Sequence, residues 1–344
     1  MTQDPERPLV LCCPWPRSLE LIFTPERLAD LRACYRLVET TDADLPNLSD
    51  QQLREARYII GQPPLDDAIL SRLVSLRCIF NVESNLINNM PYDQVFARGI
   101  HVVTTGAVFA EPVAEIGLGF ALSLLRNIHG ADADFRKGQE AWGGAGNGDA
   151  RLLTGAEVGI IGFGDLGRAL ARVLTGFRPK LQIHDPWLPE ARILEAGALP
   201  ATLDAVMGQS DVVFVTAAVT SENRGFLGEA EFAAMRPGAA FILLSRADVV
   251  DFSALMAAVA SGHIRAATDV FPQEPMPVDH PVRKLPGLLL SAHRAGALDV
   301  AFKRMGEMVW QDMSLLDKGL PPNLCKRAER ETVARMQSRP VTVN

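Results

Sequence analysis

The chain has 344 residues, of which 48% are hydrophobic and 22% charged, and its formal net charge is −7. This composition is typical of a soluble globular protein, and the length suggests two domains. The negative net charge gives no electrostatic reason to bind nucleic acid or an anionic membrane, and we expect neither as a partner.

The cysteines and the N-terminal segment indicate the compartment. The five cysteines are scattered, and none forms a CxxC pair, so the pattern suggests neither a zinc site nor a disulfide framework. The first residues, MTQDPERP, are polar and lack the apolar stretch of a signal peptide. No uncharged apolar run reaches the length of a membrane span. We therefore expect a cytoplasmic protein without a bound metal.

Short apolar runs and helical patterns alternate in the first hundred residues. The apolar runs predict strands at residues 9–13, 35–38, 58–60, 78–82 and 101–103. Helical patterns lie between most of these runs, as at residues 25–33, 66–74 and 92–97. Strands that alternate with helices are typical of a parallel sheet covered on both faces, so this part is predicted to be one α/β unit.

A long apolar helix is predicted next, over residues 111–129. Pro112 is tolerated near its start because first-turn amides have no partner within a helix. The central sequence IGLGFALSLL is apolar nearly all round, so we expect this helix to be buried between domains or between subunits. The glycine-rich segment 143–150 is predicted to be a flexible connection.

A second α/β unit begins at about residue 157. Its predicted strands are residues 158–161, 180–184, 212–216, 240–244, 266–269 and 288–290. A final helix is expected over about residues 298–316, and the charged tail after Pro321 is expected to pack weakly or to extend.

The first predicted strand of this unit runs into a glycine-rich loop. The sequence VGIIGFGDLG at residues 158–167 contains a GxGxxG pattern made by Gly162, Gly164 and Gly167. The pattern alone is weak because glycines are common in turns. Here a predicted strand precedes it, a helical segment follows it, and Asp185 ends the next strand about 20 residues on, as a dinucleotide-binding fingerprint requires.

Each residue of this loop has a physical task. Gly162 permits the tight turn, Gly164 leaves room for a pyrophosphate, and Gly167 allows the helix to pack closely on the strand. The backbone amides of Asp165 and Leu166, at the helix N-terminus, would face the phosphates. The Asp165 carboxylate is unusual there because it places a negative charge beside them.

Asp185 predicts which dinucleotide binds. A carboxylate at this position accepts hydrogen bonds from the ribose diol and repels a 2′-phosphate, so NAD is expected rather than NADP. The next residues, Pro186 and Trp187, supply no basic side chain for such a phosphate. A glycine-rich turn without a nucleotide is the less favoured alternative.

Further motifs surround the loop in a consistent order. They are TGAVFAEPVAEIGLGFALSLLR (105–126), RKGQEAW (136–142), VTSENRGFLG (219–228), MRPGAAFILLSRADVVDFSAL (235–255), ATDVFPQEP (267–275) and SAHRAGA (291–297). With the glycine loop, they resemble the D-isomer-specific 2-hydroxyacid dehydrogenase family over residues 76–323. That family includes phosphoglycerate, glyoxylate/hydroxypyruvate, D-lactate and formate dehydrogenases.

The resemblance implies a fold of two doubly wound α/β domains. A Rossmann NAD-binding domain is expected at residues 107–298. A discontinuous, flavodoxin-like substrate domain is expected to combine residues 1–106 with residues 299–344, which form a returning C-terminal helix and tail. The C-terminal regulatory domain of some phosphoglycerate dehydrogenases is expected to be absent.

Carried over by motif, the resemblance makes Arg246, Glu274 and His293 the catalytic residues. Reduction of a 2-keto acid needs a cation that binds the carboxylate and polarises the carbonyl, which the planar fork of arginine does well. Histidine can give the carbonyl oxygen its proton, and a carboxylate bound to that histidine sets its tautomer. Each residue alone has an ordinary explanation as a surface or loop residue, whereas all three in this order favour catalysis.

The same resemblance implies further cofactor contacts. Asp269 is expected to hold the nicotinamide carboxamide, and the backbone of Thr216, Ala217 and Leu244 is expected to line the ribose and the ring. These contacts are weaker predictions because backbone contacts leave little trace in a sequence.

The sequence departs from the family in its substrate loop. The family's glycine-containing loop aligns with NVESNLINN at residues 81–89, where Glu83 and Asn85 replace glycines. Ser84 and Asn85 are expected to bind the substrate carboxylate through backbone amides. Glu83 would disfavour a highly anionic substrate, and the segment 61–67 lacks basic residues. A phosphoglycerate-type substrate is therefore possible but is not supported by this region.

The leading hypothesis is an enzyme that interconverts a 2-keto acid and a D-2-hydroxy acid with NAD(H), acting as a homodimer. One alternative is a non-catalytic, NAD-sensing interaction protein, because the family resembles corepressors that kept the fold and the three residues. Another is an oxidiser of phosphite or formate, which would share the cofactor and the arginine.

Overall fold

The computed structural model describes residues 7–83 and 85–335, and the chain divides into two compact units. Unit 1 contains the residues up to Phe109 and those from Ala297 onward, and unit 2 spans Ala110–Gly296. The predicted boundaries after residues 106 and 298 lie within three residues of this division.

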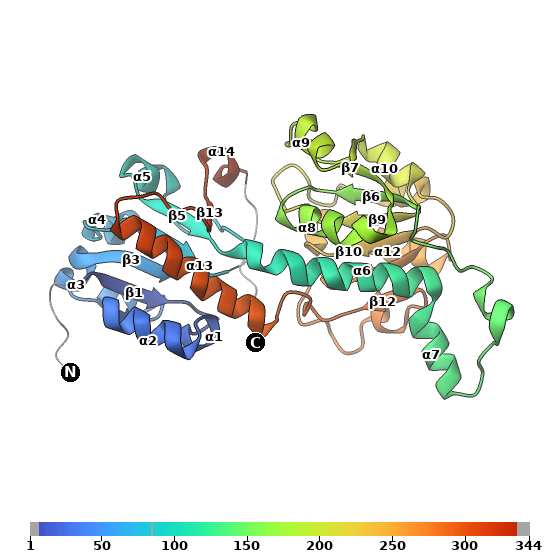
Figure 1. Ribbon diagram of the computed structural model, residues 1–344, viewed down its shortest axis with the longest axis horizontal. Coiled ribbons are helices and arrows are strands. Elements are labelled where there is room, and N and C mark those ends of the chain that lie inside the picture. Colours follow the sequence, from blue (N-terminus) through green and yellow to red (C-terminus); the bar gives the residue numbers. More distant parts are fainter. Residues whose placement is uncertain (1–6, 84, 336–344) are drawn as a thin grey trace. The chain divides into compact units, whose positions relative to one another are not determined.

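Unit 1 contains a six-stranded sheet with the strand order β13-β5-β4-β3-β1-β2 (Figure 1). Its strands are β1 (Leu9–Cys13), β2 (Arg36–Glu39), β3 (Ala56–Gly61), β4 (Cys78–Asn81), β5 (His101–Thr104) and β13 (Lys326–Arg327). The first five are parallel and confirm the strands predicted from apolar runs. The inner strands are nearly continuous apolar runs because helices cover both faces of the sheet, whereas the edge strand β2 is only partly buried.

The helices of unit 1 form two layers on this sheet. They are α1 (Leu19–Ile22), α2 (Pro25–Cys34), α3 (Asp50–Glu55), α4 (Asp67–Arg72), α5 (Tyr92–Ala97), α13 (Asp299–Asp317) and α14 (Arg330–Val333), with 3₁₀ turns η1 (Leu45–Asn47) and η2 (Gly106–Phe109). One apolar core joins α1, α2 and α13 to one face, and a second joins α3, α4 and α5 to the other. The short helices α1 and α3 were not predicted, although Ser18 and Ser49 cap their N-termini.

The charged tail after Pro321 does not behave as the sequence predicted. Its strand β13 pairs antiparallel with β5, and Cys325 and Ala328 are buried. The cause is Asp312 of α13, whose fully buried carboxylate accepts hydrogen bonds from the amides of Asn323, Leu324 and Cys325 at 2.8–3.0 Å. A buried acceptor thus fixes a segment whose side chains alone suggested weak packing.

Unit 2 contains a seven-stranded, all-parallel sheet with the order β12-β11-β10-β9-β6-β7-β8. Its strands are β6 (Glu157–Ile161), β7 (Lys180–His184), β8 (Leu199–Pro200), β9 (Val212–Val215), β10 (Ala240–Leu243), β11 (Arg265–Thr268) and β12 (Leu288–Leu290). All but the two-residue β8 were predicted. The strand order reverses between β6 and β9, and such a switch point is where doubly wound sheets bind dinucleotides.

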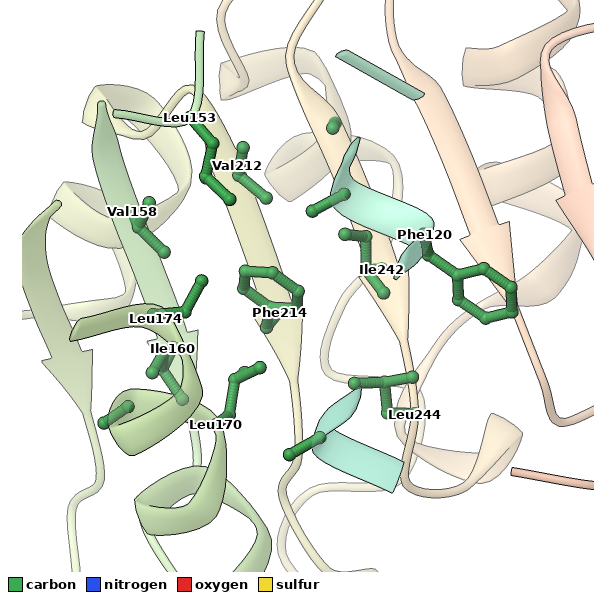
Figure 2. Packing of buried hydrophobic residues seen from close by; sticks show 14 of the residues in the cluster. Phe120, Leu153, Val158, Ile160, Leu170, Leu174, Val212, Phe214, Ile242 and Leu244 are labelled. Atoms are coloured by element: carbon green, nitrogen blue, oxygen red, sulfur yellow. The ribbon is translucent and has the colours of Figure 1, made fainter. Parts of the chain in front are cut away.

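Helices cover both faces of this sheet as well. They are α6 (Ala110–Arg126), α7 (Ile128–Arg136), α8 (Asp165–Leu174), α9 (Glu190–Glu195), α10 (Leu203–Gln209), α11 (Glu229–Ala234) and α12 (Phe252–Ala260), with 3₁₀ turns η3 (Gly143–Asn147), η4 (Thr175–Phe177), η5 (Ala247–Val249) and η6 (Pro281–Lys284). Figure 2 shows the core in which Phe214 of β9 lies among Ile160 of β6, Leu170 and Leu174 of α8. Together with the α/β organisation of unit 1, this confirms the predicted fold class.

Helix α6 is the long apolar helix predicted from the sequence. It ends at Arg126, three residues before the predicted end at residue 129, because Asn127 adopts a left-handed backbone with φ of 49°. Its apolar face packs on α8 and β10 of its own unit, and a Cβ at Gly117 would lie 2.6 Å from the Leu244 side chain. Within the described residues, only the segment Gly106–Arg126 is long and apolar enough to cross a membrane, and half of it is buried in the structure, as is common for core helices.

The role of Asp312 leads to a stability prediction. Asp312→Ala removes the acceptor for three buried amides, and we expect the free energy of unfolding to fall by about 2–4 kcal/mol in urea titrations. Asp299→Ala, on the same helix with a side chain that is 80% exposed, should change it far less. Equal effects of the two substitutions would show that Asp312 does not hold the tail.

Candidate functional site

The glycine loop follows β6 at the switch point of the unit 2 sheet. Gly162 has φ of +88°, and a Cβ there would lie 2.5 Å from the Cα of Ala217. Gly167 is equally restricted, because a Cβ would lie 2.4 Å from the carbonyl oxygen of Gly162. Both glycines are therefore required by the backbone itself: one by its conformation and both by close approach.

Gly164 differs from its two neighbours in this loop. A Cβ at Gly164 would meet no atom within 4 Å, so its missing side chain leaves open space directly before α8. Gly164 is also the N-cap residue of this ten-residue helix, whose first-turn amides lack helical partners. The predicted residues Asp165 and Leu166 form the first turn. Open space beside the N-terminus of a helix, where the dipole favours negative charge, fits a phosphate group.

The strand ends around the loop are fixed by hydrogen bonds. The Thr216 hydroxyl donates to the carbonyl oxygens of Ile161 and Gly162, which ties the segment after β9 to the loop. The Asp185 carboxylate, at the end of β7, accepts hydrogen bonds from the amides of Phe163 (2.7 Å) and Trp187 (3.1 Å). Asp185 is therefore held beside the loop, and its expected contact with the ribose stays a prediction.

The negative charge of Asp165 has a partner in the same helix. Its carboxylate lies 3.9 Å from the guanidinium of Arg168, and both side chains are about 40% exposed. An acidic residue in the first turn also interacts favourably with the helix dipole. The Asp165 carboxylate therefore stabilises the N-terminus of α8 and remains partly exposed to solvent.

The three predicted catalytic residues all lie at the carboxyl edge of the unit 2 sheet. Arg246 follows β10, Glu274 lies in the loop after β11, and His293 follows β12. These strands are neighbours, so their loops converge although the residues are distant in sequence. Arg246 has an extended backbone, with φ of −148°, and Ala247, which begins η5, is not among the residues with a positive φ, so neither residue is strained.

His293 and Glu274 are in direct contact. Nδ1 of His293 lies 2.6 Å from Oε2 of Glu274, and the amide of Phe271 donates to Oε1 at 2.8 Å. Burial by itself would raise the pKa of Glu274, but these hydrogen bonds and the charges of His293 and Arg246 hold that pKa below its usual value. An ionised Glu274 requires a proton on Nδ1, which leaves Nε2 as the nitrogen available to a ligand.

Asp269 has a role that the sequence did not suggest. Its carboxylate is buried and accepts hydrogen bonds from the amides of Arg294 (3.1 Å) and Ala295 (3.0 Å). Its carbonyl oxygen accepts the amide of His293 at 2.7 Å. Together these bonds hold His293 at φ of +48°, a left-handed backbone that non-glycine residues adopt only under constraint. The predicted contact of Asp269 with a nicotinamide carboxamide stays a prediction.

Leu244 is buried beside α6, and Thr216 and Ala217 border the glycine loop, so the segments predicted to line the cofactor lie at one edge of the sheet.

Among the other histidines, Nδ1 of His184 lies 3.2 Å from the Ala201 carbonyl, and His280 caps η6. In the described ranges, no group of three or more His, Cys, Asp or Glu side chains could hold a metal ion.

The predicted substrate loop lies after β4 in unit 1. Ser84 falls outside the described residues, whereas Asn85 is half-buried and its carbonyl accepts a hydrogen bond from Nδ2 of Asn81 at 2.9 Å. Glu83 is buried, and its carboxylate lies 3.3 Å from the guanidinium of Arg17. This compensation removes the basis for expecting Glu83 to disfavour an anionic substrate. Arg17 itself was not recognised in the sequence.

Comparison with known proteins agrees with this arrangement. The profile of the D-isomer specific 2-hydroxyacid dehydrogenase, NAD binding domain, matches residues 118–295. A glyoxylate reductase of Korarchaeum cryptofilum is 31% identical over 76% of this chain and 79% of its own length, and one of Thermofilum pendens is 30% identical over 87% and 91%. A crystal structure of a phosphoglycerate oxidoreductase from Rhizobium etli is 62% identical, with a TM-score of 0.88 over 95% of this chain and all of that chain.

The depressed pKa of Glu274 predicts a pH-dependent stability. A carboxyl group with a lowered pKa in the folded state stabilises the protein above its unfolded pKa of about 4.5 and loses this effect as the pH falls through the folded value. Thermal unfolding of the wild type and Glu274→Gln should therefore differ most near neutral pH and converge below about pH 4.5. A difference that stays constant down to about pH 3 would contradict the assigned contacts.

Proposed function

Because the chain belongs to the D-isomer-specific 2-hydroxyacid dehydrogenase family, we propose that it transfers hydride between NAD(H) and a 2-keto acid, interconverting it with a D-2-hydroxy acid. The chain is an NAD(P)-dependent hydroxyacid oxidoreductase by this membership. The main support for this reaction is the contact between Nδ1 of His293 and Oε2 of Glu274 at 2.6 Å, because it orients a histidine for proton transfer.

The cofactor is NAD(H), since the matched domain is the NAD-binding domain of the family. The open space at Gly164 and the N-terminus of α8, where the helix dipole favours negative charge, fit its pyrophosphate. Asp185 would accept hydrogen bonds from the adenosine ribose, and its fixed negative charge supports the preference for NAD over NADP. When bound, NADH supplies the hydride.

We assign the remaining steps to three side chains. The guanidinium of Arg246 binds the substrate carboxylate and polarises the neighbouring carbonyl group. Nε2 of His293 donates its proton to the carbonyl oxygen as the carbon accepts hydride, and takes that proton back in the oxidative direction. Glu274 accepts the hydrogen bond from Nδ1–H of His293, so that the proton exchanged with the substrate is carried on Nε2.

The relatives narrow the substrate class. Two of them are named glyoxylate reductases, which supports a small 2-keto acid such as glyoxylate or hydroxypyruvate. The Rhizobium etli protein is named a phosphoglycerate oxidoreductase, and the ion pair between Arg17 and Glu83 removes one objection to a phosphorylated substrate. Phosphohydroxypyruvate is therefore the second candidate. A non-catalytic NAD-sensing protein is not favoured, because these relatives are named as enzymes and the catalytic contact is intact.

Activity assays test this proposal. NADH oxidation should be detected with at least one of glyoxylate, hydroxypyruvate and phosphohydroxypyruvate, and Arg246→Ala and His293→Ala should each lower kcat/KM by about 100-fold or more. NADH affinity, measured by fluorescence titration, should remain close to that of the wild type. His280→Ala, which removes a capping histidine from the same unit, serves as the control and should stay active.

No turnover by wild-type protein that binds NADH would refute the reaction. Full activity of His293→Ala would refute the role of the histidine while leaving the reaction standing. Phosphite and formate, tested with NAD, distinguish the remaining alternative substrates.

We also propose a homodimer. On α7 and the segment after it, the described structure exposes large apolar side chains, namely Ile128 (55%), Phe135 (61%), Trp142 (75%) and Leu152 (68%). Exposed apolar side chains gathered on one segment are typical of protein–protein interfaces. Sedimentation equilibrium should give a dimer that Phe135→Asp weakens. A monomeric wild type at micromolar concentration would contradict this.

A further inference from the structure

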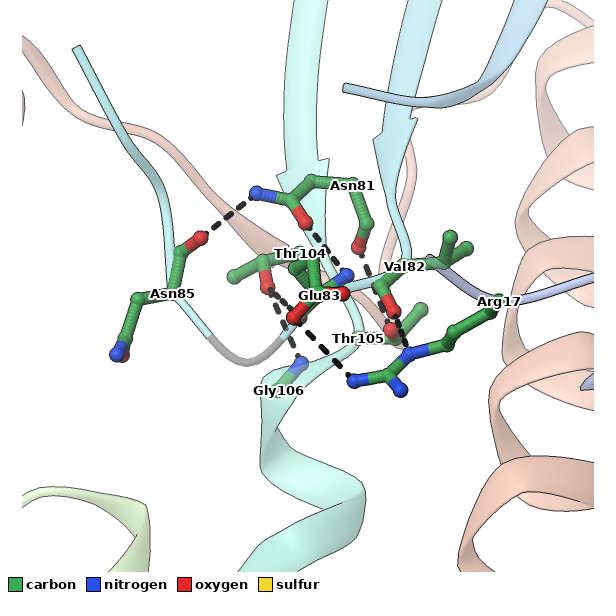
Figure 3. A network of polar contacts seen from close by, with 8 residues as sticks. All are labelled: Arg17, Asn81, Val82, Glu83, Asn85, Thr104, Thr105 and Gly106. Carbon is green, nitrogen blue, oxygen red and sulfur yellow. Dashed lines mark hydrogen bonds and ion pairs between the residues drawn. The ribbon is translucent and has the colours of Figure 1, made fainter. Parts of the chain in front are cut away.

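Arg17 connects two loops at the carboxyl edge of the unit 1 sheet. It follows β1, and its side chain reaches the segment that follows β4, two strands away in the sheet (Figure 3). Nε donates a hydrogen bond to the carbonyl oxygen of Val82 at 2.7 Å, and Nη2 donates to Oε2 of Glu83 at 3.3 Å. One guanidinium therefore holds both the backbone and the side chain of the substrate loop.

The surroundings of Arg17 show that this contact is built into the unit. The guanidinium carbon lies 5.5 Å from the ring centroid of Phe109 and 5.1 Å from that of Phe302, which permits cation–π interactions. Burial lowers the pKa of Arg17, and the charge of Glu83 opposes this shift. The side chains of Arg17 and Glu83 are only 14% and 6% exposed. A pair so desolvated contributes little net stability, which favours a functional reason for it.

The loop is also held from its other side. The Glu83 amide donates to Oδ1 of Asn81 at 2.7 Å, and the Glu83 carbonyl accepts the hydroxyl of Thr104 at 3.3 Å. Nδ2 of Asn81 binds the carbonyl of Asn85. The carbonyl oxygens of Val82, Glu83 and Asn85 thus all have protein donors (Figure 3).

We propose that Arg17 is a positioning residue for substrate binding. It holds Val82 and Glu83 in one conformation, so that this loop receives the substrate carboxylate without the glycines usual in the family. It also neutralises Glu83, so that an anionic substrate is not repelled. Arg17 does not itself react, and this inference rests on the proposed function because it assumes a 2-keto acid as the substrate.

Kinetic constants of Arg17 variants test the inference. Arg17→Met removes both hydrogen bonds and leaves the Glu83 carboxylate without its arginine. We expect KM for the best 2-keto acid to rise about tenfold or more, with kcat reduced much less and NADH affinity unchanged. Arg17→Lys keeps the charge without the two-point contact and should give an intermediate KM. Arg17→Met combined with Glu83→Gln should recover part of the KM, because it removes the repulsion.

Arg36→Met is the matched control. Arg36, at the opposite, amino-terminal end of β2, pairs with Glu55 at 2.6 Å, and its side chain is 17% exposed, close to the value for Arg17. Loss of this pair should lower the melting temperature and leave KM unchanged. If Arg17→Met and Arg17→Lys lower the melting temperature but leave KM at the wild-type value, as Arg36→Met should, Arg17 is merely structural and the inference is wrong.

Hydrogen exchange separates this failure from a failure of the proposed function. Amides in a peptide covering residues 79–90 should exchange faster in Arg17→Met than in Arg36→Met, whether or not the wild type turns over any keto acid. Unchanged exchange would overturn the positioning role directly. If exchange is faster but the protein turns over no keto acid, Arg17 holds the loop but has no 2-keto acid to position there. That result would overturn the inference because the assumed substrate is wrong.

Discussion

The buried carboxylate of Asp269 holds the turn that carries His293. It accepts the amides of Arg294 and Ala295, and the carbonyl of the same residue accepts the amide of His293. A left-handed backbone at a non-glycine residue costs about 1–3 kcal/mol, so His293 would relax without these three bonds. Relaxation would move Nδ1 away from Glu274, and the histidine would lose both its orientation and its fixed tautomer.

A similar use of buried charge recurs in unit 1. The Asp312 carboxylate accepts hydrogen bonds from three backbone amides and fixes the strand after α13. At the substrate loop, the charges of Arg17 and Glu83 neutralise each other in an ion pair. Buried charges are tolerated only when they are paired or hydrogen-bonded. In each case a buried charged side chain holds the backbone of a segment outside its own helix or strand. At the substrate loop the parallel sheet brings the two segments together, because the loops that follow its strands β1 and β4 lie at the same edge.

Much of this architecture could be predicted from the sequence, for physical reasons. Strands buried on both faces form uninterrupted apolar runs, and Gly167 is required by a contact with Gly162, only five residues earlier in the same loop. Arg246, Glu274 and His293 each lie in a motif that can be recognised from its neighbouring residues, and the three motifs follow one another in the chain. Arg17 could not be found in this way, because its partner Glu83 lies 66 positions further along the chain and neither position forms a pattern with its neighbours. The second role of Asp269 and the anchoring of the tail by Asp312 were missed for the same reason.

A crystal structure of the complex with NADH and oxamate, an unreactive analogue of a 2-keto acid, tests the central claim most directly. The account predicts that the carboxylate of oxamate binds the guanidinium of Arg246 and that its amide carbonyl oxygen lies within about 3 Å of Nε2 of His293. Nδ1 of His293 should remain on Glu274. Oxamate bound away from His293, or a His293 ring turned so that Nε2 faces Glu274, would contradict the proposed transfer of the proton.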